Sequence, residues 1–154
     1  MVSPPPVDDV RIAMELHVPT DVRLIERVVA LVSRQVRDLD FPLQICTLNV
    51  PVALSEALSN AMLRGNQDDR AKHVRIRAAI DRHQLVLEVA DEGGGFDMDL
   101  CTIDPTTPDN VAREDGRGLY LMHRLMDRVE RFSESGDSEG STRGNVVRLT
   151  LRRP

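Results

Sequence analysis

The sequence predicts an α+β fold, a two-layer sandwich in which helices cover one face of a mixed, mostly antiparallel sheet. Two observations favour this fold. Several segments alternate apolar and polar residues, which is typical of strands with one buried face. Other segments carry apolar residues at helical spacing, and together they give the order strand, helix, helix, two or more strands, helix, strand. An all-parallel sheet would require continuous apolar runs in its strands instead.

The first half of the chain is expected to form one strand and two helices. The strand lies at residues 11–18, where every second residue is apolar. Thr20 is expected to cap the helix that follows, which extends to about Arg37. A second helix is expected to begin after Pro42 and to end at Gly65, because glycine suits a helix C-cap.

The second half is expected to complete the sheet. A β-hairpin is predicted at residues 73–90 from its alternation on both sides of a polar turn. Residues 97–115 form a long polar connection with two prolines, which is unusual in a compact domain unless it is a functional lid or disordered. A helix is then expected to begin at Gly118 and to continue to Val129, followed by a last strand at residues 145–152.

Length and composition restrict the class of protein. The 154 residues suit one domain, and we expect a flexible tail at residues 1–10 and a single domain at residues 11–154. The net charge of -5 and the aromatic content of 3% argue against direct nucleic-acid binding. No apolar run is long enough to span a bilayer, and the two cysteines show no metal-binding spacing. We therefore expect a cytoplasmic protein without a membrane partner.

A polar stripe on the second predicted helix is the first candidate site. Glu56, Asn60 and Arg64 follow one another at intervals of four residues and so lie on one side of an α-helix. Such a stripe often faces only water. Alternatively, an Asn oxygen is a suitable ligand for Mg²⁺, and a Glu one turn away can deprotonate a hydroxyl group, so the pair suits phosphoryl transfer.

Two glycine clusters form the other candidate sites. The stretch "DEGGGFD", residues 91–97, follows a strand, and Asp91 at the strand end can accept a hydrogen bond from an exocyclic amino group such as that of adenine. The stretch "DGRGLYLM", residues 115–122, precedes a predicted helix whose first amides can hold phosphate. Each cluster alone is also typical of a plain turn or a helix cap.

The order of the three clusters is more specific than any one of them. An E-x3-N helix, a D-x-G-x-G after a strand and a G-x-G-L at a helix start resemble the Bergerat-fold nucleotide-binding domain shared by DNA gyrase, MutL, the ninety-kilodalton chaperone and histidine kinases. Within that superfamily, the phrases "EALSNAMLRGN", "VADEGGGFD" and "GRGLYLMHRLMD" are similar to those of bacterial anti-sigma-factor serine/threonine kinases. The resemblance covers the chain from about Glu15 to the C-terminus.

The resemblance implies a role for each matching residue. Glu56 would be the catalytic base, Asn60 would coordinate Mg²⁺, and Asp91 would bind the adenine amino group. The positions implied to bind ATP are Asn60, Arg64, Asp91, Gly93, Gly95, Gly116, Arg117, Gly118, Leu119 and Asn145. The chain departs from the family at two of them, with Arg64 where the family often has His and Asn145 where it often has Thr. Arg keeps the positive charge, whereas Asn145 differs from Thr in hydrogen-bonding geometry.

The resemblance also implies partners. The expected activity is transfer of the ATP γ-phosphate to a Ser or Thr of a STAS-domain anti-anti-sigma protein. The competing partner would be an RNA polymerase sigma factor held by a kinase homodimer. The alternative is a nucleotide-binding regulatory module that binds partners without kinase activity, or without binding sigma.

Overall fold

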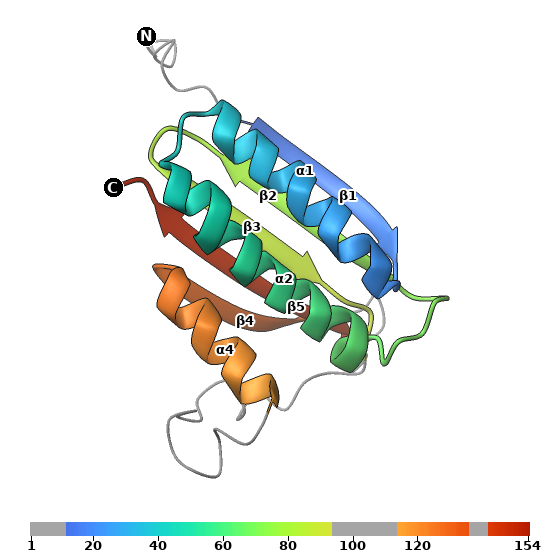
Figure 1. Ribbon diagram of the computed structural model, residues 1–154. Coiled ribbons are helices and arrows are strands. Elements are labelled where there is room, and N and C mark those ends of the chain that lie inside the picture. The colour runs from blue at the N-terminus through green and yellow to red at the C-terminus, as the bar shows by residue number, and fades with distance from the viewer. Residues whose placement is uncertain (1–11, 94–113, 136–141) are drawn as a thin grey trace, which may run out of the picture.

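The computed structural model describes residues 12–93, 114–135 and 142–154, and in this part of the chain it forms helices on one face of a five-stranded sheet (Figure 1). The strand order is β1-β2-β3-β5-β4, and each of these neighbouring pairs is antiparallel. The strands are β1 (Ile12–Pro19), β2 (His73–Ile80), β3 (Gln84–Ala90), β4 (Arg128–Ser135) and β5 (Thr142–Arg152). The helical elements are η1 (Val22–Leu24), α1 (Ile25–Asp38), η2 (Ile45–Asn49), α2 (Val50–Asn60), η3 (Ala61–Gly65) and α4 (Glu114–Leu125). The predicted α+β sandwich is confirmed, with a wholly antiparallel sheet among the described strands.

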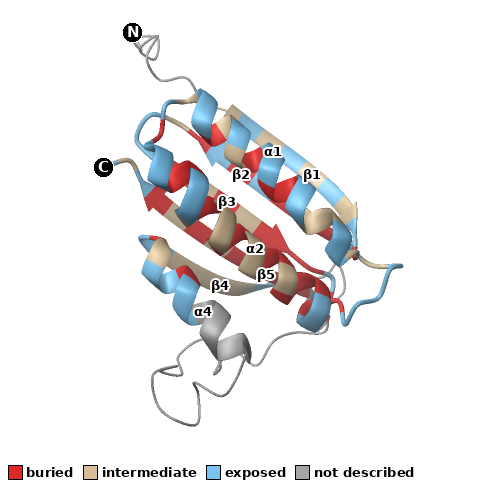
Figure 2. Cartoon of the chain, in the orientation of Figure 1, coloured by how far each residue is buried: buried red, intermediate tan, exposed pale blue. Residues whose placement is uncertain are grey.

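The core lies between the helices and the inner face of the sheet, where buried residues recur on the facing sides of both layers (Figure 2). Its side chains are mostly aliphatic, as the scarcity of aromatic residues predicts, and Phe41 is an aromatic exception. The largest fully buried side chains include Leu54, Leu58, Met62, Ile76, Ile80, Leu85, Leu87, Met122 and Leu149. Burial of each such side chain contributes roughly 1.5–3 kcal/mol, so this layer holds α2 firmly against the central strands.

The helix that contains α2 is longer than α2 itself and includes two π-helical segments. Helical backbone is continuous from Leu43 to Gly65, with η2 before α2 and η3 after it. A π turn contains more residues than an α turn, so each segment changes the direction in which the following side chains point. The segment η3 comes directly after Asn60 and therefore affects the candidate site.

Two predicted helix caps are wrong. Thr20 does not cap the first helix: its hydroxyl group donates to the Lys72 carbonyl at 2.9 Å. Asp21 is the N-cap of η1 instead, with its Oδ1 accepting from the Arg23 N–H at 3.0 Å. At the other end of the long helix, the C-cap is Asn66, which has right-handed backbone angles. Gly65 does not have the positive φ of a left-handed cap.

The last predicted helix is also placed too late in the chain. The helix α4 begins at Glu114 rather than Gly118, and it ends at Leu125 rather than near Val129. The residues that follow form β4, a strand that the sequence analysis did not predict. This strand occupies the edge of the sheet beside β5.

The outer face of the sheet, away from the helices, carries one row of alternating charge. Strand register aligns Glu15, Arg77, Glu88, Arg148 and Glu130 across all five strands. Ion pairs join neighbours in this charge row, with 3.4 Å from Arg77 Nε to Glu15 Oε1 and 3.4 Å from Arg148 Nε to Glu88 Oε1. Opposite charges on directly paired strand positions favour this register.

Candidate nucleotide-binding site

Asp91 is the buried carboxylate at the end of β3, and only 4% of its surface is exposed. Its Oδ1 accepts hydrogen bonds from the Gly93 N–H at 2.8 Å and the Asn145 N–H at 3.3 Å. Burial raises the pKa of Asp91, while the amides of Gly93 and Asn145 and the positive charge of Arg131 act in the opposite direction. A buried carboxylate held in this way can accept a hydrogen bond from a ligand that donates one, such as an amino group.

Three glycines let the backbone approach Asp91 closely. A Cβ atom at Gly65 would lie 2.2 Å from Asp91 Oδ2, and one at Gly93 would lie 1.6 Å from the Gly65 carbonyl oxygen. Gly144 has a φ of +143°, and a Cβ atom there would lie 1.7 Å from the Asp91 carbonyl oxygen. No real side chain tolerates these distances. Close approach to the carboxylate therefore explains Gly65, in place of the helix cap that the sequence suggested.

The polar stripe runs from α-helical into π-helical backbone. Glu56 and Asn60 lie one turn apart within α2, with Asn60 buried and Glu56 partly exposed. Arg64 lies in η3 and is exposed. The Glu56 and Asn60 pair thus lies on regular α-helix, whereas the direction of Arg64 depends on the wider π turn.

Asn60 offers the chemistry of a magnesium ligand. Its amide oxygen is a neutral, hard donor, and Mg²⁺ bound beside nucleotide phosphates usually takes only one or two protein ligands. Among residues 12–93, 114–135 and 142–154, no group of three or more His, Cys, Asp or Glu residues could hold a metal ion. A single Asn beside phosphate oxygens fits the way this cation binds, whereas a dedicated protein cage does not occur in that part of the chain.

The start of α4 provides backbone amides for an anion. Because the helix begins at Glu114, the N–H of Gly116 is among the first amides, which have no acceptor within the helix, and Arg117 follows it in the first turn. Gly118 and Leu119 lie deeper in the helix than the sequence analysis expected. Gly95 and most of the predicted lid lie outside the described residues.

Comparison with known proteins gives the family of the chain. The family model of the histidine kinase-like ATPase domain matches residues 17–151. The chain belongs to this family. Its fold also resembles the mycobacterial sensor histidine kinase MprB, with a TM-score of 0.54 over 92% of this chain and 99% of that chain at 17% identity.

Two curated relatives of this histidine kinase-like ATPase domain carry more specific names. The serine-protein kinase RsbW of Bacillus subtilis (strain 168) is 37% identical over 100 residues, covering 62% of each chain. The anti-sigma F factor of Clostridium beijerinckii is 32% identical over 91 residues, covering 58% of this chain and 63% of the relative. The matched part of this chain thus spans less than two thirds of either relative.

Asn145, the departure from the Gly-Thr pattern of the resembled family, lies beside Asp91 in this ATPase domain. Its side chain is buried, and Ser133 Oγ lies 3.5 Å from its Oδ1. Its Nδ2 lies near enough to favour the charged form of Asp91, but it makes no hydrogen bond with the described residues. A buried amide without an acceptor is a donor available to a bound base or water.

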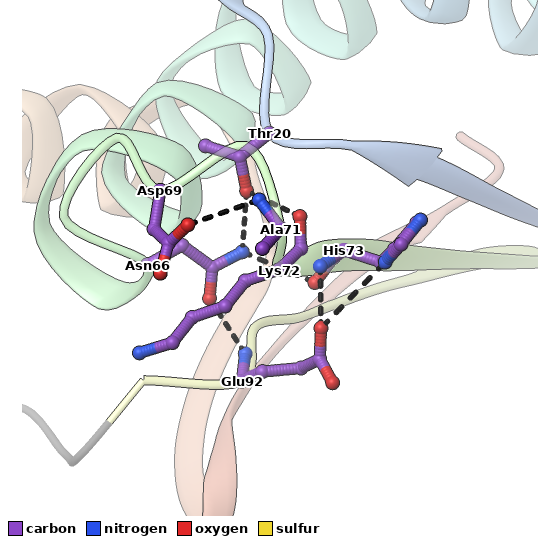
Figure 3. Close-up of polar contacts among 7 residues, drawn as sticks. All are labelled: Thr20, Asn66, Asp69, Ala71, Lys72, His73 and Glu92. Carbon is purple, nitrogen blue, oxygen red and sulfur yellow. Dashed lines mark hydrogen bonds and ion pairs between the residues drawn. The ribbon is translucent and has the colours of Figure 1, made fainter.

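Sequence analysis missed Asn66, which follows Gly65 and is fully buried. Its side chain bonds to Thr20, His73 and Glu92, from three other segments (Figure 3). An Asn after a helix glycine is usually an ordinary turn residue, so the sequence offers no local signal for this role.

Among the described helices of the domain, we find none with the length and apolarity needed to cross a membrane.

Proposed function

We propose that this histidine kinase-like ATPase domain is an ATP-dependent serine/threonine protein kinase that acts as an anti-sigma factor in a partner-switching system. The observation that carries this proposal is the buried Asp91 carboxylate, enclosed by glycines and fixed by two backbone amides, close to the helix that bears Glu56 and Asn60. The names of the two relatives, a serine-protein kinase and an anti-sigma F factor, support the same activity.

Each proposed role follows from the chemistry of the residue. The adenine amino group donates to Asp91, Gly93 and Gly95 shape the base pocket, and the first amides of α4 bind phosphate. Asn60 contributes an oxygen ligand to Mg²⁺, which neutralises charge on the phosphates when it is bound. Glu56 accepts the proton of the attacking Ser or Thr hydroxyl as its oxygen bonds to the γ-phosphorus and the bond to ADP breaks.

The proposed partners are a STAS-domain anti-anti-sigma protein, as the phosphorylated substrate, and an RNA polymerase sigma factor, as the protein held by a kinase homodimer. The relative named anti-sigma F factor supports the second partner. These partners act in the cytoplasm, so we propose the same location for this protein. Affinity capture with and without ATP tests the switch, because nucleotide-dependent exchange of a STAS protein and a sigma factor is expected.

Glu56→Gln separates binding from chemistry. This variant should bind Mg-ATP as the wild type does and transfer phosphate to the STAS substrate roughly 10² to 10⁴ times more slowly, because a general base is lost. Asn60→Ala should instead weaken Mg²⁺-dependent ATP binding. Calorimetry measures binding, and single-turnover transfer of labelled phosphate measures chemistry.

Glu26→Gln is the matched control, because Glu26 is an exposed carboxylate on α1 rather than α2. It should change neither ATP binding nor phosphoryl transfer. Equal loss of ATP binding in the Glu56 and Asn60 variants would contradict the assigned roles. ATP binding by the wild type without any transfer would instead support the alternative, a nucleotide-binding regulatory module.

A further inference from the structure

Asn66 joins segments of the chain that are far apart in the sequence (Figure 3). Its Oδ1 accepts from the Glu92 N–H at 2.7 Å. Its Nδ2 donates to Thr20 Oγ1 at 2.8 Å and to the His73 carbonyl at 3.1 Å. The amide therefore connects the end of the long helix to the β1–α1 turn, the start of β2 and the residue after Asp91.

The orientation of the Asn66 amide is determined by its partners. The Thr20 hydroxyl donates its only proton to the Lys72 carbonyl, so it can only accept from Asn66. The Glu92 N–H can only donate, so it requires the Asn66 oxygen. A flipped amide would leave three buried or partly buried groups unsatisfied, which would be costly.

Glu92 is held from two sides. Asn66 fixes its backbone N–H, and the backbone N–H of His73 donates to its carboxylate. Glu92 lies between Asp91 and Gly93, and the Gly93 N–H bonds back to Asp91 Oδ1 across it. A rotation of the Glu92 peptide would move the Gly93 N–H and, with it, the Asp91 carboxylate that accepts from this N–H.

We propose that Asn66 and Thr20 are positioning residues for base recognition, which hold Glu92 so that Asp91 presents its carboxylate to the amino group of adenine. This inference rests on the proposed role of Asp91 as the adenine acceptor. Asn66 and Thr20 act through Asp91 and do not contact the nucleotide. Loss of either should reduce selectivity for the amino group in addition to any loss of stability.

The test compares ATP with purine riboside triphosphate, which lacks the 6-amino group. Calorimetry on folded protein should show that Asn66→Ala weakens ATP binding roughly 10- to 100-fold, the range of one hydrogen bond to a charged group, and weakens binding of the analogue much less. In an Asp91→Asn background, Asn66→Ala should cause no further loss of ATP affinity. Equal weakening for both nucleotides, or unchanged affinities with a lower melting temperature, would overturn the proposal.

Thr20 provides a second pair of variants if Asn66→Ala does not fold. Thr20→Val keeps the shape of the side chain and removes its hydroxyl group, so the preference for ATP should fall. Thr20→Ser restores the hydroxyl group and should restore the preference, and a failure of this rescue would contradict the proposal.

Asn49→Ala is the matched control, because Asn49 also bonds to a distant carbonyl, that of Leu125 at 2.7 Å, and does not contact Glu92. It should leave the preference for ATP unchanged, and an equal loss of this preference in Asn49→Ala would count against a specific role for Asn66.

A wrong assignment of Asp91 as the adenine acceptor would give a different result. If wild type and Asp91→Asn bind ATP equally, the adenine assignment is wrong whatever the Asn66 variants do.

Discussion

Asp91 and Glu15 are carboxylates on opposite faces of one sheet, and their surroundings shift their pKa values in opposite directions. Burial raises the pKa of Asp91. Glu15 is exposed, and its hydrogen bond with His17 and the charge of Arg77 lower its pKa. The charged form of the outer carboxylate is thus favoured by its neighbours, whereas burial disfavours the charged form of the inner one despite the two backbone amides that donate to it. Perturbed buried groups of this kind are typical of functional sites.

The largest expected effect is on the inner face, at Gly93→Ala. The added Cβ would lie 1.6 Å from the Gly65 carbonyl oxygen, so the backbone on one side must move. We expect the free energy of unfolding to fall by about 3 kcal/mol or more, as measured by denaturant titration. Ala79→Val enlarges an exposed residue of the outer face and should change the free energy of unfolding by less than about 0.5 kcal/mol. Wild-type stability of Gly93→Ala would contradict the close packing described above.

The next effect is the pH dependence caused by Asp91. Because its pKa is raised in the folded protein, the folded state favours the protonated form, and this contribution is lost as pH rises through the raised pKa. Without nucleotide, wild type should therefore lose stability relative to Asp91→Asn as pH rises from below the ordinary Asp pKa of about 3.9 through the raised pKa of Asp91. Denaturation of both proteins across this range measures the difference. A difference independent of pH would show that Asp91 does not titrate in this way.

The smallest expected effect is on the charge row of the outer face. Glu88→Gln removes one ion pair with Arg148, and Glu88 is still partly exposed to solvent. Exposed pairs contribute about 0.2–1 kcal/mol, so the free energy of unfolding should fall by no more than that. The loss should shrink further in high salt, because salt screens exposed charges. A loss as large as that of Gly93→Ala would remove the contrast between the two faces.

Most of the fold could be predicted from the sequence because four strands have one buried face, so that apolar and polar residues alternate along them. The strand β4 was missed for two reasons. Its inward positions include Arg131 and Ser133, which are polar, so the alternation is weak. Its first residues also continue the helical spacing of Met122 and Met126, which extended the predicted helix too far.

The site was predictable where the chemistry is local. Asp91 was found because glycines follow it directly, and Glu56 and Asn60 because they are one helical turn apart. Asn66 was missed because its partners Thr20 and Glu92 lie 46 and 26 residues away in the sequence. The π-helical turn after Asn60 was missed for a related reason, since a π turn has no distinct residue pattern of its own.

That π turn behaves like a single inserted residue that the helix absorbs without breaking. If η3 took up regular α-helical bonding with no residue removed, every later side chain of the helix would turn by about 100° around its axis. Gly65 would then leave Asp91, and the Asn66 amide would no longer face Glu92. At its present number of residues, the long helix therefore holds Gly65 and Asn66 at the site only with the π turn in place.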